Sequence, residues 1–107
     1  MIGVDEARDL QADEERSRAA PILMRRPDIV ALKTAVDRTG KSERTIRNWC
    51  RVYGIARQTA PGAPLEISAP ALEMVLHGDF EALEMLRSGD RNSLQVKRYF
   101  DHLGLPA

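Results

Sequence analysis

The segment 43–53 carries apolar side chains at helical spacing, and this pattern restricts its fold more than any other part of the chain. Ser42, a good N-cap residue, stands directly before it, and Gly54 stands where helices commonly end in glycine. The apolar positions recur at i, i+3, i+4 and i+7, the spacing of one buried helix face, and they are Ile46, Trp49, Cys50 and Tyr53. The sequence therefore predicts a helix over 42–53 that packs on a core through this stripe.

The opposite face of the same helix is basic and polar. It consists of Arg44, Arg47, Asn48 and Arg51. An α-helix fits the major groove of duplex DNA, where arginine can bond guanine and asparagine can bond adenine with two hydrogen bonds each. We therefore predict a recognition helix in which Arg47 and Asn48 read bases, while Arg44 and Arg51 contact bases or phosphate edges.

Further polar residues flank this helix and are expected to hold the DNA backbone. Lys41 and Ser42 lie at its positively polarised N-terminus, which is a favourable place for a phosphate group. Arg57 and Gln58 follow the helix at the base of a predicted β-hairpin. The predicted DNA-binding set is Lys41, Ser42, Arg44, Arg47, Asn48, Arg51, Arg57 and Gln58.

The charge of the chain is balanced overall but unevenly distributed. Its 107 residues carry 16 basic and 16 acidic side chains. Residues 25–57 hold 9 bases and 3 acids, whereas residues 1–24 hold 6 acids and 3 bases, and residues 58–107 hold 7 acids and 4 bases. A basic middle third points to a local anionic partner.

The elements around the recognition helix follow from capping, turn and periodicity signals. Asp28 is expected to cap a preceding helix with Ile29, Leu32 and Val36 on one face, which should end near Arg38 because Thr39–Gly40 is a break signal. Residues 55–58 and 65–67 are expected to pair across a turn rich in proline and glycine. Three more helices are expected: one capped by Ser68, one over Phe80–Arg87, and one over Ser93–Leu103 opened by an Asn92–Gln95 capping box.

These elements predict a mainly α fold, a winged helix-turn-helix with a short two-stranded β-wing and additional C-terminal helices. We expect an acidic N-terminal helix or arm and linker over 1–27, the DNA-binding unit over 28–78, and a C-terminal helical pair over 79–107 packed on it in a single compact domain. The apolar faces of that pair leave two alternatives open, namely packing within the chain or a homodimer. His77, Tyr99 and Phe100 are interpreted as packing residues.

The run from Val36 to Trp49 resembles the helix-turn-helix core of MerR-like and excisionase-like proteins. The matching positions are Gly40, Ser42, Arg44, Thr45, Ile46 and Trp49. The resemblance covers roughly residues 28–77 and implies sequence-specific binding to double-stranded DNA, as a transcriptional regulator or an excisionase-like recombination factor. Because no long C-terminal heptad helix follows and the wing tip has no basic residue, it favours the excisionase type over an effector-sensing regulator.

Other classes of function find little support in the sequence. His77 and His102 have no partner at metal-ligand spacing, and the lone Cys50 lies on the apolar stripe, so we expect no metal, no cofactor and no enzyme. No small-molecule effector is evident, no membrane span is expected, and the single cysteine suits the cytoplasm. The alternative is a protein-interaction module whose basic face docks an acidic partner, or is covered by the acidic N-terminal arm.

Overall fold

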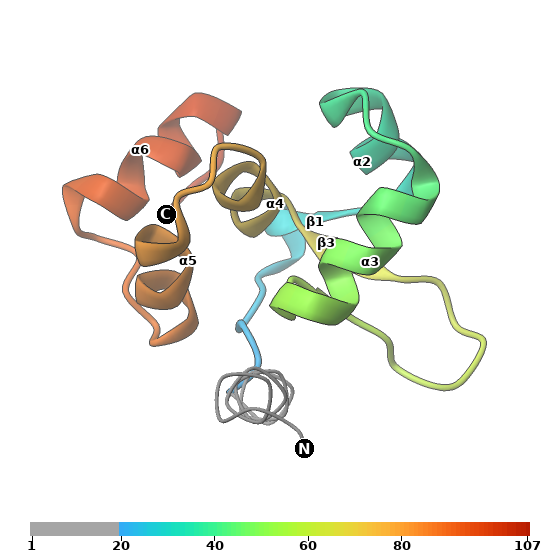
Figure 1. The fold of residues 1–107 in the computed structure, drawn as a ribbon. Helices are drawn as coiled ribbons and strands as arrows, with labels where there is room; N and C mark the ends of the chain where they lie inside the picture. Colours follow the sequence, from blue (N-terminus) through green and yellow to red (C-terminus); the bar gives the residue numbers. More distant parts are fainter. Residues whose placement is uncertain (1–19) are drawn as a thin grey trace, which may run out of the picture.

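The computed structural model describes residues 20–107, so the predicted helix or arm over residues 1–19 lies outside the described part. The fold is mainly helical and compact, with a small antiparallel sheet (Figure 1). In chain order the elements are a 3-10 turn η1 (Arg26–Asp28), β1 (Ile29–Val30), α2 (Leu32–Thr39), α3 (Glu43–Tyr53), β2 (Ala56–Arg57), β3 (Glu66–Ser68), α4 (Ala69–Leu76), α5 (Phe80–Arg87) and α6 (Leu94–Leu103).

The sheet has three strands in the order β1-β3-β2, and both pairings are antiparallel. The predicted hairpin is confirmed, since Ala56 lies opposite Ile67 across the β2–β3 pair. The strand β1 was not predicted: Val30 also pairs with Ile67, on the other edge of β3. Two β-branched residues suit such a half-buried strand, and the pairing ties the start of the described chain to its middle.

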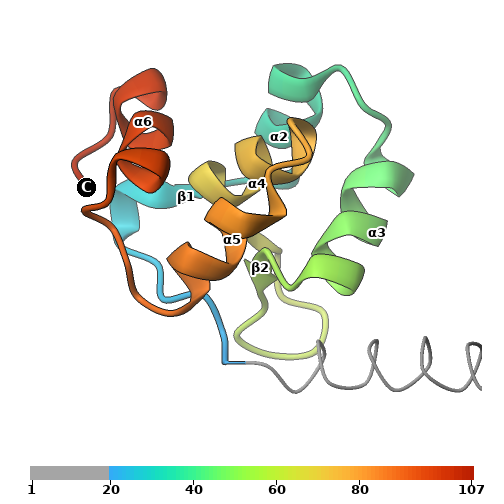
Figure 2. The same cartoon turned by 60° about the vertical axis from the view of Figure 1, so that its left-hand side comes forward.

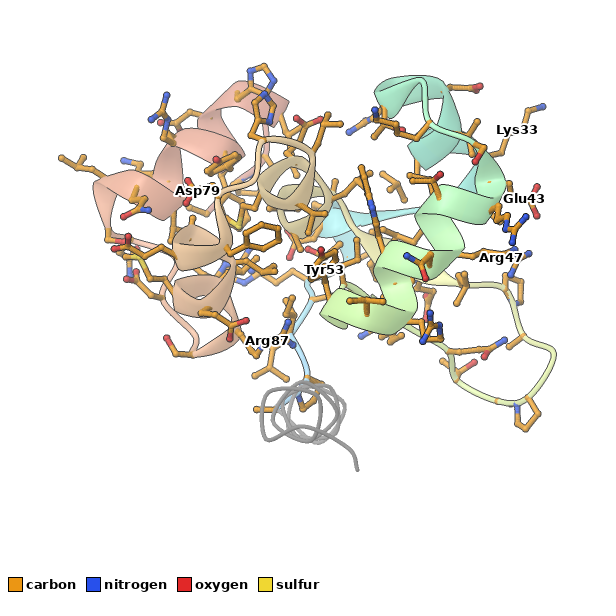
Figure 3. The ribbon with its side chains drawn as sticks, in the orientation of Figure 1. Lys33, Glu43, Arg47, Tyr53, Asp79 and Arg87 are labelled. Atoms are coloured by element: carbon orange, nitrogen blue, oxygen red, sulfur yellow. The ribbon has the colours of Figure 1, made fainter. Side chains whose placement is uncertain are left out.

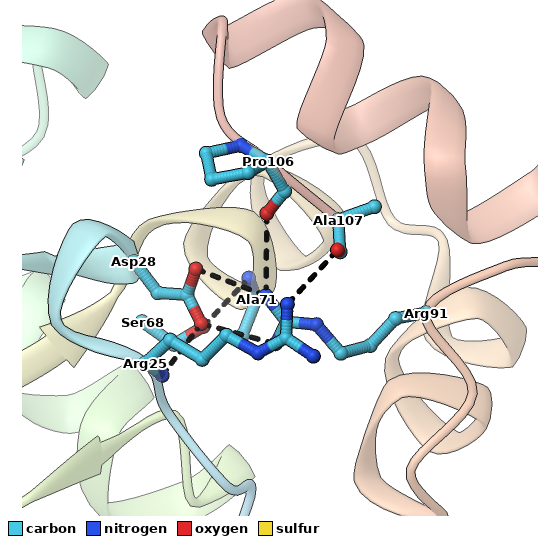
Figure 4. Close-up of polar contacts among 7 residues, drawn as sticks. All are labelled: Arg25, Asp28, Ser68, Ala71, Arg91, Pro106 and Ala107. Atoms are coloured by element: carbon cyan, nitrogen blue, oxygen red, sulfur yellow. Dashed lines mark hydrogen bonds and ion pairs between the residues drawn. The ribbon is translucent and has the colours of Figure 1, made fainter.

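The expected helix cap at Asp28 is wrong. Helix α2 begins only at Leu32, and its N-cap residue is Ala31, because Ile29 and Val30 are taken up by the sheet. Asp28 is instead 2% exposed, and its carboxylate accepts hydrogen bonds from the Arg25 backbone N–H and from the guanidinium of Arg91 (Figure 4).

Helix α4 lies at the centre of the fold, between the α2–α3 pair and the α5–α6 pair (Figures 1 and 2). Every residue from Ala69 to Val75 is buried, because the segment is almost entirely apolar and can face neighbours all round. Ser68 caps this helix as predicted, with its hydroxyl 3.3 Å from the backbone nitrogen of Ala71. The core that forms around α4 also takes up Ile22, Ala35, Ile46, Ile55, Ile67, Ala82, Leu83, Leu86, Val96, Tyr99 and Phe100.

The C-terminal helices α5 and α6 pack against α4 and against each other. Asp79 caps α5 through the backbone N–H of Ala82, at 3.1 Å. The predicted Asn92–Gln95 box is wrong, because the carboxylate of Asp90 accepts the backbone N–H groups of Asn92 and Ser93, each at 3.0 Å, while Gln95 reaches back to Asp79. Within residues 20–107, no helix is both long and apolar enough to cross a membrane.

Candidate nucleic-acid interface

Helix α3 forms where capping and periodicity place it. The hydroxyl of Ser42 accepts the backbone N–H of Thr45 at 3.1 Å, which satisfies one of the free donors of the first turn. At the other end Gly54 adopts the left-handed conformation, with φ of 63°, and its N–H donates to the carbonyl of Cys50 at 3.1 Å. Both predicted ends of this helix are confirmed.

The inward face of α3 is the predicted apolar stripe. Ile46 is fully buried, and Trp49, Cys50 and Tyr53 are partly buried against the core. Burial raises the pKa of the Cys50 thiol to about 11, and the charge of Arg47 offsets this only in part. The thiol is therefore protonated near neutral pH, which fits a packing residue better than a nucleophile.

The outward face of α3 presents the predicted polar set to solvent. Figure 3 shows Arg47 on the side of the helix turned away from α4, α5 and α6. A broad, shallow hollow of about 630 Å³ runs along this face, and its lining consists of Arg44, Thr45, Arg47, Asn48 and Arg51. The structure thus brings together, on one exposed surface, the two predicted base readers Arg47 and Asn48 and the two arginines predicted to contact bases or phosphate edges.

Two contacts within this face position its side chains. The guanidinium of Arg51 donates to Oδ1 of Asn48 at 2.7 Å, which leaves the amide NH₂ of Asn48 for another acceptor. A carboxamide oxygen has two lone pairs, so Oδ1 can accept a second donor without losing Arg51. Asn48 therefore keeps the donor and the acceptor that a bidentate contact with adenine requires.

An ion pair joins Arg47 to Glu43, with Nε and Oε1 3.1 Å apart, one helical turn from each other. Both side chains are more than half exposed, at 56% and 63%. Exposed pairs of this spacing stabilise a helix by about 0.3–0.5 kcal/mol. Breaking this ion pair, so that Arg47 can contact a phosphate or a guanine instead of Glu43, therefore costs little free energy.

The remaining predicted residues lie on either side of this face. Lys41 and Ser42 are exposed in the turn before α3. Arg57 is exposed on β2, where its Nε donates to Glu66 of β3 at 3.1 Å. Gln58 donates its amide N–H to the carbonyl of Ala63 at 2.6 Å, and so closes the loop between the two strands. Arg57 and Gln58 are thus engaged within the hairpin, unlike Lys41.

Two residues near this surface were not singled out from the sequence. Figure 3 places Lys33 of α2 on the same side of the molecule as Glu43 and Arg47, and Lys33 is exposed. The only feature of the sequence that points to Lys33 is that it is one of the basic residues in the range 25–57.

The second residue is Arg87, whose side chain is 7% exposed. Its guanidinium donates to the carbonyl of Tyr53 at the C-terminal end of α3, and to the carbonyl of Ala20 at 3.2 Å. A cation at this end complements the helix dipole, so Arg87 stabilises the C-terminal end of α3. No local pattern marks it, because these partners are 34 and 67 residues away along the chain.

Comparison with known proteins adds no further constraint on the function of this chain. No protein-family model, no curated protein and no solved structure matches it.

Proposed function

We propose that this chain binds double-stranded DNA in a sequence-specific manner through α3, as a transcriptional regulator or an excisionase-like recombination factor. The observation that carries the proposal is the exposed face of α3, on which three arginines and one asparagine stand opposite a stripe buried in the core. Arginine and asparagine are the side chains best matched to the edges of guanine and adenine in the major groove.

The elements around α3 support the same proposal. Helix α2, the turn at Gly40 and helix α3 follow one another in helix-turn-helix order. The β2–β3 hairpin follows directly and supplies a wing, to which β1 adds a third strand. In this proposal the fold is a winged helix-turn-helix of the MerR-like or excisionase-like kind, and Lys33 and Lys41 contact phosphates beside the groove.

The wing itself contributes little positive charge. Its loop over residues 59–64 has no basic side chain, and Arg57 at its base is paired with Glu66. In this proposal the recognition helix and the turn before it therefore carry most of the electrostatic contact.

Selection from a random duplex library, followed by titration of the enriched sequence, tests specific readout. Asn48→Ala should relax the preference at one base pair and weaken binding by about 1–3 kcal/mol. Asn92→Ala, on an exposed loop far along the chain, is the matched control and should bind as the unsubstituted protein does. A library that yields no enriched motif would contradict specific readout.

The salt dependence of the same complex tests the electrostatic part. The affinity for duplex should fall as salt rises, and Lys41→Ala should reduce the slope of log K against log salt by about 0.9 if Lys41 meets one phosphate. Lys97→Ala removes the same charge from the exposed surface of α6 and should leave the slope unchanged.

The alternative is a protein-interaction module that docks an acidic partner. It is favoured by one observation: Arg47 and Arg57 both already hold a carboxylate, from Glu43 and Glu66. If the chain fails to bind any duplex at low salt, this alternative replaces DNA binding. A homodimer through the C-terminal helices stays a prediction; Leu83 and Leu86 of α5 are buried within the chain, whereas Phe80 is 44% exposed.

A further inference from the structure

A second hollow lies on the C-terminal helices, on other elements than the proposed DNA-binding face. Its volume is about 810 Å³, within the usual size range of small-molecule sites. It forms where α4 ends and α5 begins, against the outer side of α6, and its lining consists of His77, Gly78, Asp79, Arg98, Tyr99 and His102. Figure 3 shows Asp79 on the side of the molecule opposite Arg47.

Asp79 and Tyr99 form a fixed pair in this hollow. The Tyr99 hydroxyl donates to Oδ2 of Asp79 at 2.8 Å, while Oδ1 accepts the backbone N–H of Ala82 and the side chain of Gln95. Partial burial opposes ionisation of Asp79, but these hydrogen bonds and the charge of Arg98 outweigh it and lower the pKa of Asp79. Its carboxylate already has three donors, so it has little need of a ligand cation.

The other polar groups of the hollow are nitrogen donors. Arg98 and His102 stand four residues apart on α6, so their side chains are neighbours on one helix face. Both are exposed, and neither donates a hydrogen bond to any residue of the described range.

His77 completes this group from the end of α4. Its Nδ1 lies 2.8 Å from the carbonyl oxygen of Glu73, which can only accept, so Nδ1 carries the proton. The carboxylate of Glu73 lies 3.6 Å from the same nitrogen. The His77 side chain is 57% exposed, and its ring stands edge-on to the ring of Tyr99.

We propose that this hollow binds a small organic oxyanion, a carboxylate or a phosphate ester, between Arg98 and His102. The guanidinium is the primary contact, because its planar donors match two oxygens of either group. Gly78 also lines the hollow, and apart from its chain neighbours no atom lies within 4 Å of where a Cβ would stand. The site is independent of the proposed DNA binding, because none of its residues belongs to α3.

Nuclear magnetic resonance titration of the full chain with two probes, inorganic phosphate and succinate, tests this site. Chloride at matched ionic strength corrects for screening. We expect saturable shifts in the backbone amides of residues 77–79 and 98–102 with at least one probe, and the tighter probe distinguishes a phosphate site from a carboxylate site. Saturable binding that shifts only the amides of α3, or no saturation with either probe, overturns the proposal.

Arg98→Ala should weaken the binding of the tighter probe at least about tenfold, because it removes a charge-assisted contact. Lys97→Ala removes the same charge one position earlier on α6, outside the hollow, and should change the affinity by less than about twofold. Both side chains are exposed, so both variants should melt as the unsubstituted protein does. Equal losses in the two variants would show general charge attraction instead of a site.

Discussion

Replacing Asp28 by asparagine should remove a large part of the stability of this fold. The carboxylate is 2% exposed, and it accepts two hydrogen bonds from the guanidinium of Arg91, at 3.1 and 3.2 Å. Arg91 has a side chain only 12% exposed, and its carbon Cζ lies 4.4 Å from the centre of the Phe100 ring (Figure 4 shows the pair without this ring). Asp28→Asn therefore leaves a buried cation without its counter-charge and sets an NH₂ donor against it.

Removing one partner of a buried ion pair costs about 3–5 kcal/mol. The free energy of unfolding of a domain is roughly 5–15 kcal/mol, so the substitution should remove a large fraction of it. In urea denaturation followed by circular dichroism, the midpoint should fall by at least about 1 M, for slopes of about 1–3 kcal/mol per M. The exposed pair supplies the control: Glu43→Gln should change the stability by less than about 0.5 kcal/mol.

A double variant tests whether Asp28 and Arg91 are energetically coupled. Arg91→Met removes the buried cation, so Asp28→Asn with Arg91→Met should cost less than the sum of the two single changes, by about 0.5–3 kcal/mol. If Asp28→Asn alone costs less than about 1 kcal/mol, or if the two changes simply add, the pair is not coupled and the argument from burial fails.

Three further predictions follow from individual contacts. Gly54→Ala should destabilise the fold by more than about 1 kcal/mol in thermal melts, because φ is 63° and an added Cβ would lie 3.1 Å from the Arg87 guanidinium. An unchanged stability would show that the backbone relaxes freely. Cys50, with its pKa raised to about 11, should react with iodoacetamide at pH 8 far more slowly in the folded than in the urea-unfolded chain. The pKa of Asp79 is lowered in the folded state, so its ionisation stabilises the fold above the unfolded pKa of about 3.9, and this stability is lost as pH falls through the folded pKa. Asp79→Ala should therefore reduce the free energy of unfolding less in acid than at neutral pH. An equal reduction at both pH values would refute this.

Helix α3 could be predicted from sequence because its determinants are local. The Ser42 cap, the stripe that begins at Ile46 and the terminal Gly54 all lie within thirteen consecutive residues. The outward placement of Arg47 and Asn48 then follows from helical geometry alone. The hairpin and the cap at Ser68 could be predicted for the same reason.

The features that sequence reasoning missed depend on residues far apart in the chain. Asp28 looks like a helix cap until Arg91, 63 residues later, is known to face it. Strand β1 has only two residues and forms because Ile67 is available on β3; the β-branched pair Ile29–Val30 was its one local signal. Arg87 carried no signal at all, although it contacts the C-terminal end of α3.

Helix α5 is hydrogen-bonded to a different helix at each end, so a movement at one end can reach the other. At its start Asp79 is tied to Tyr99 of α6, and at its last residue Arg87 is tied to Tyr53 of α3. Eight residues of helix span about 12 Å, so α5 is a short rigid connection between α6 and α3. A tilt of α5, caused at the α6 end, would move the C-terminal end of α3 and so change the direction in which its arginines face the proposed DNA.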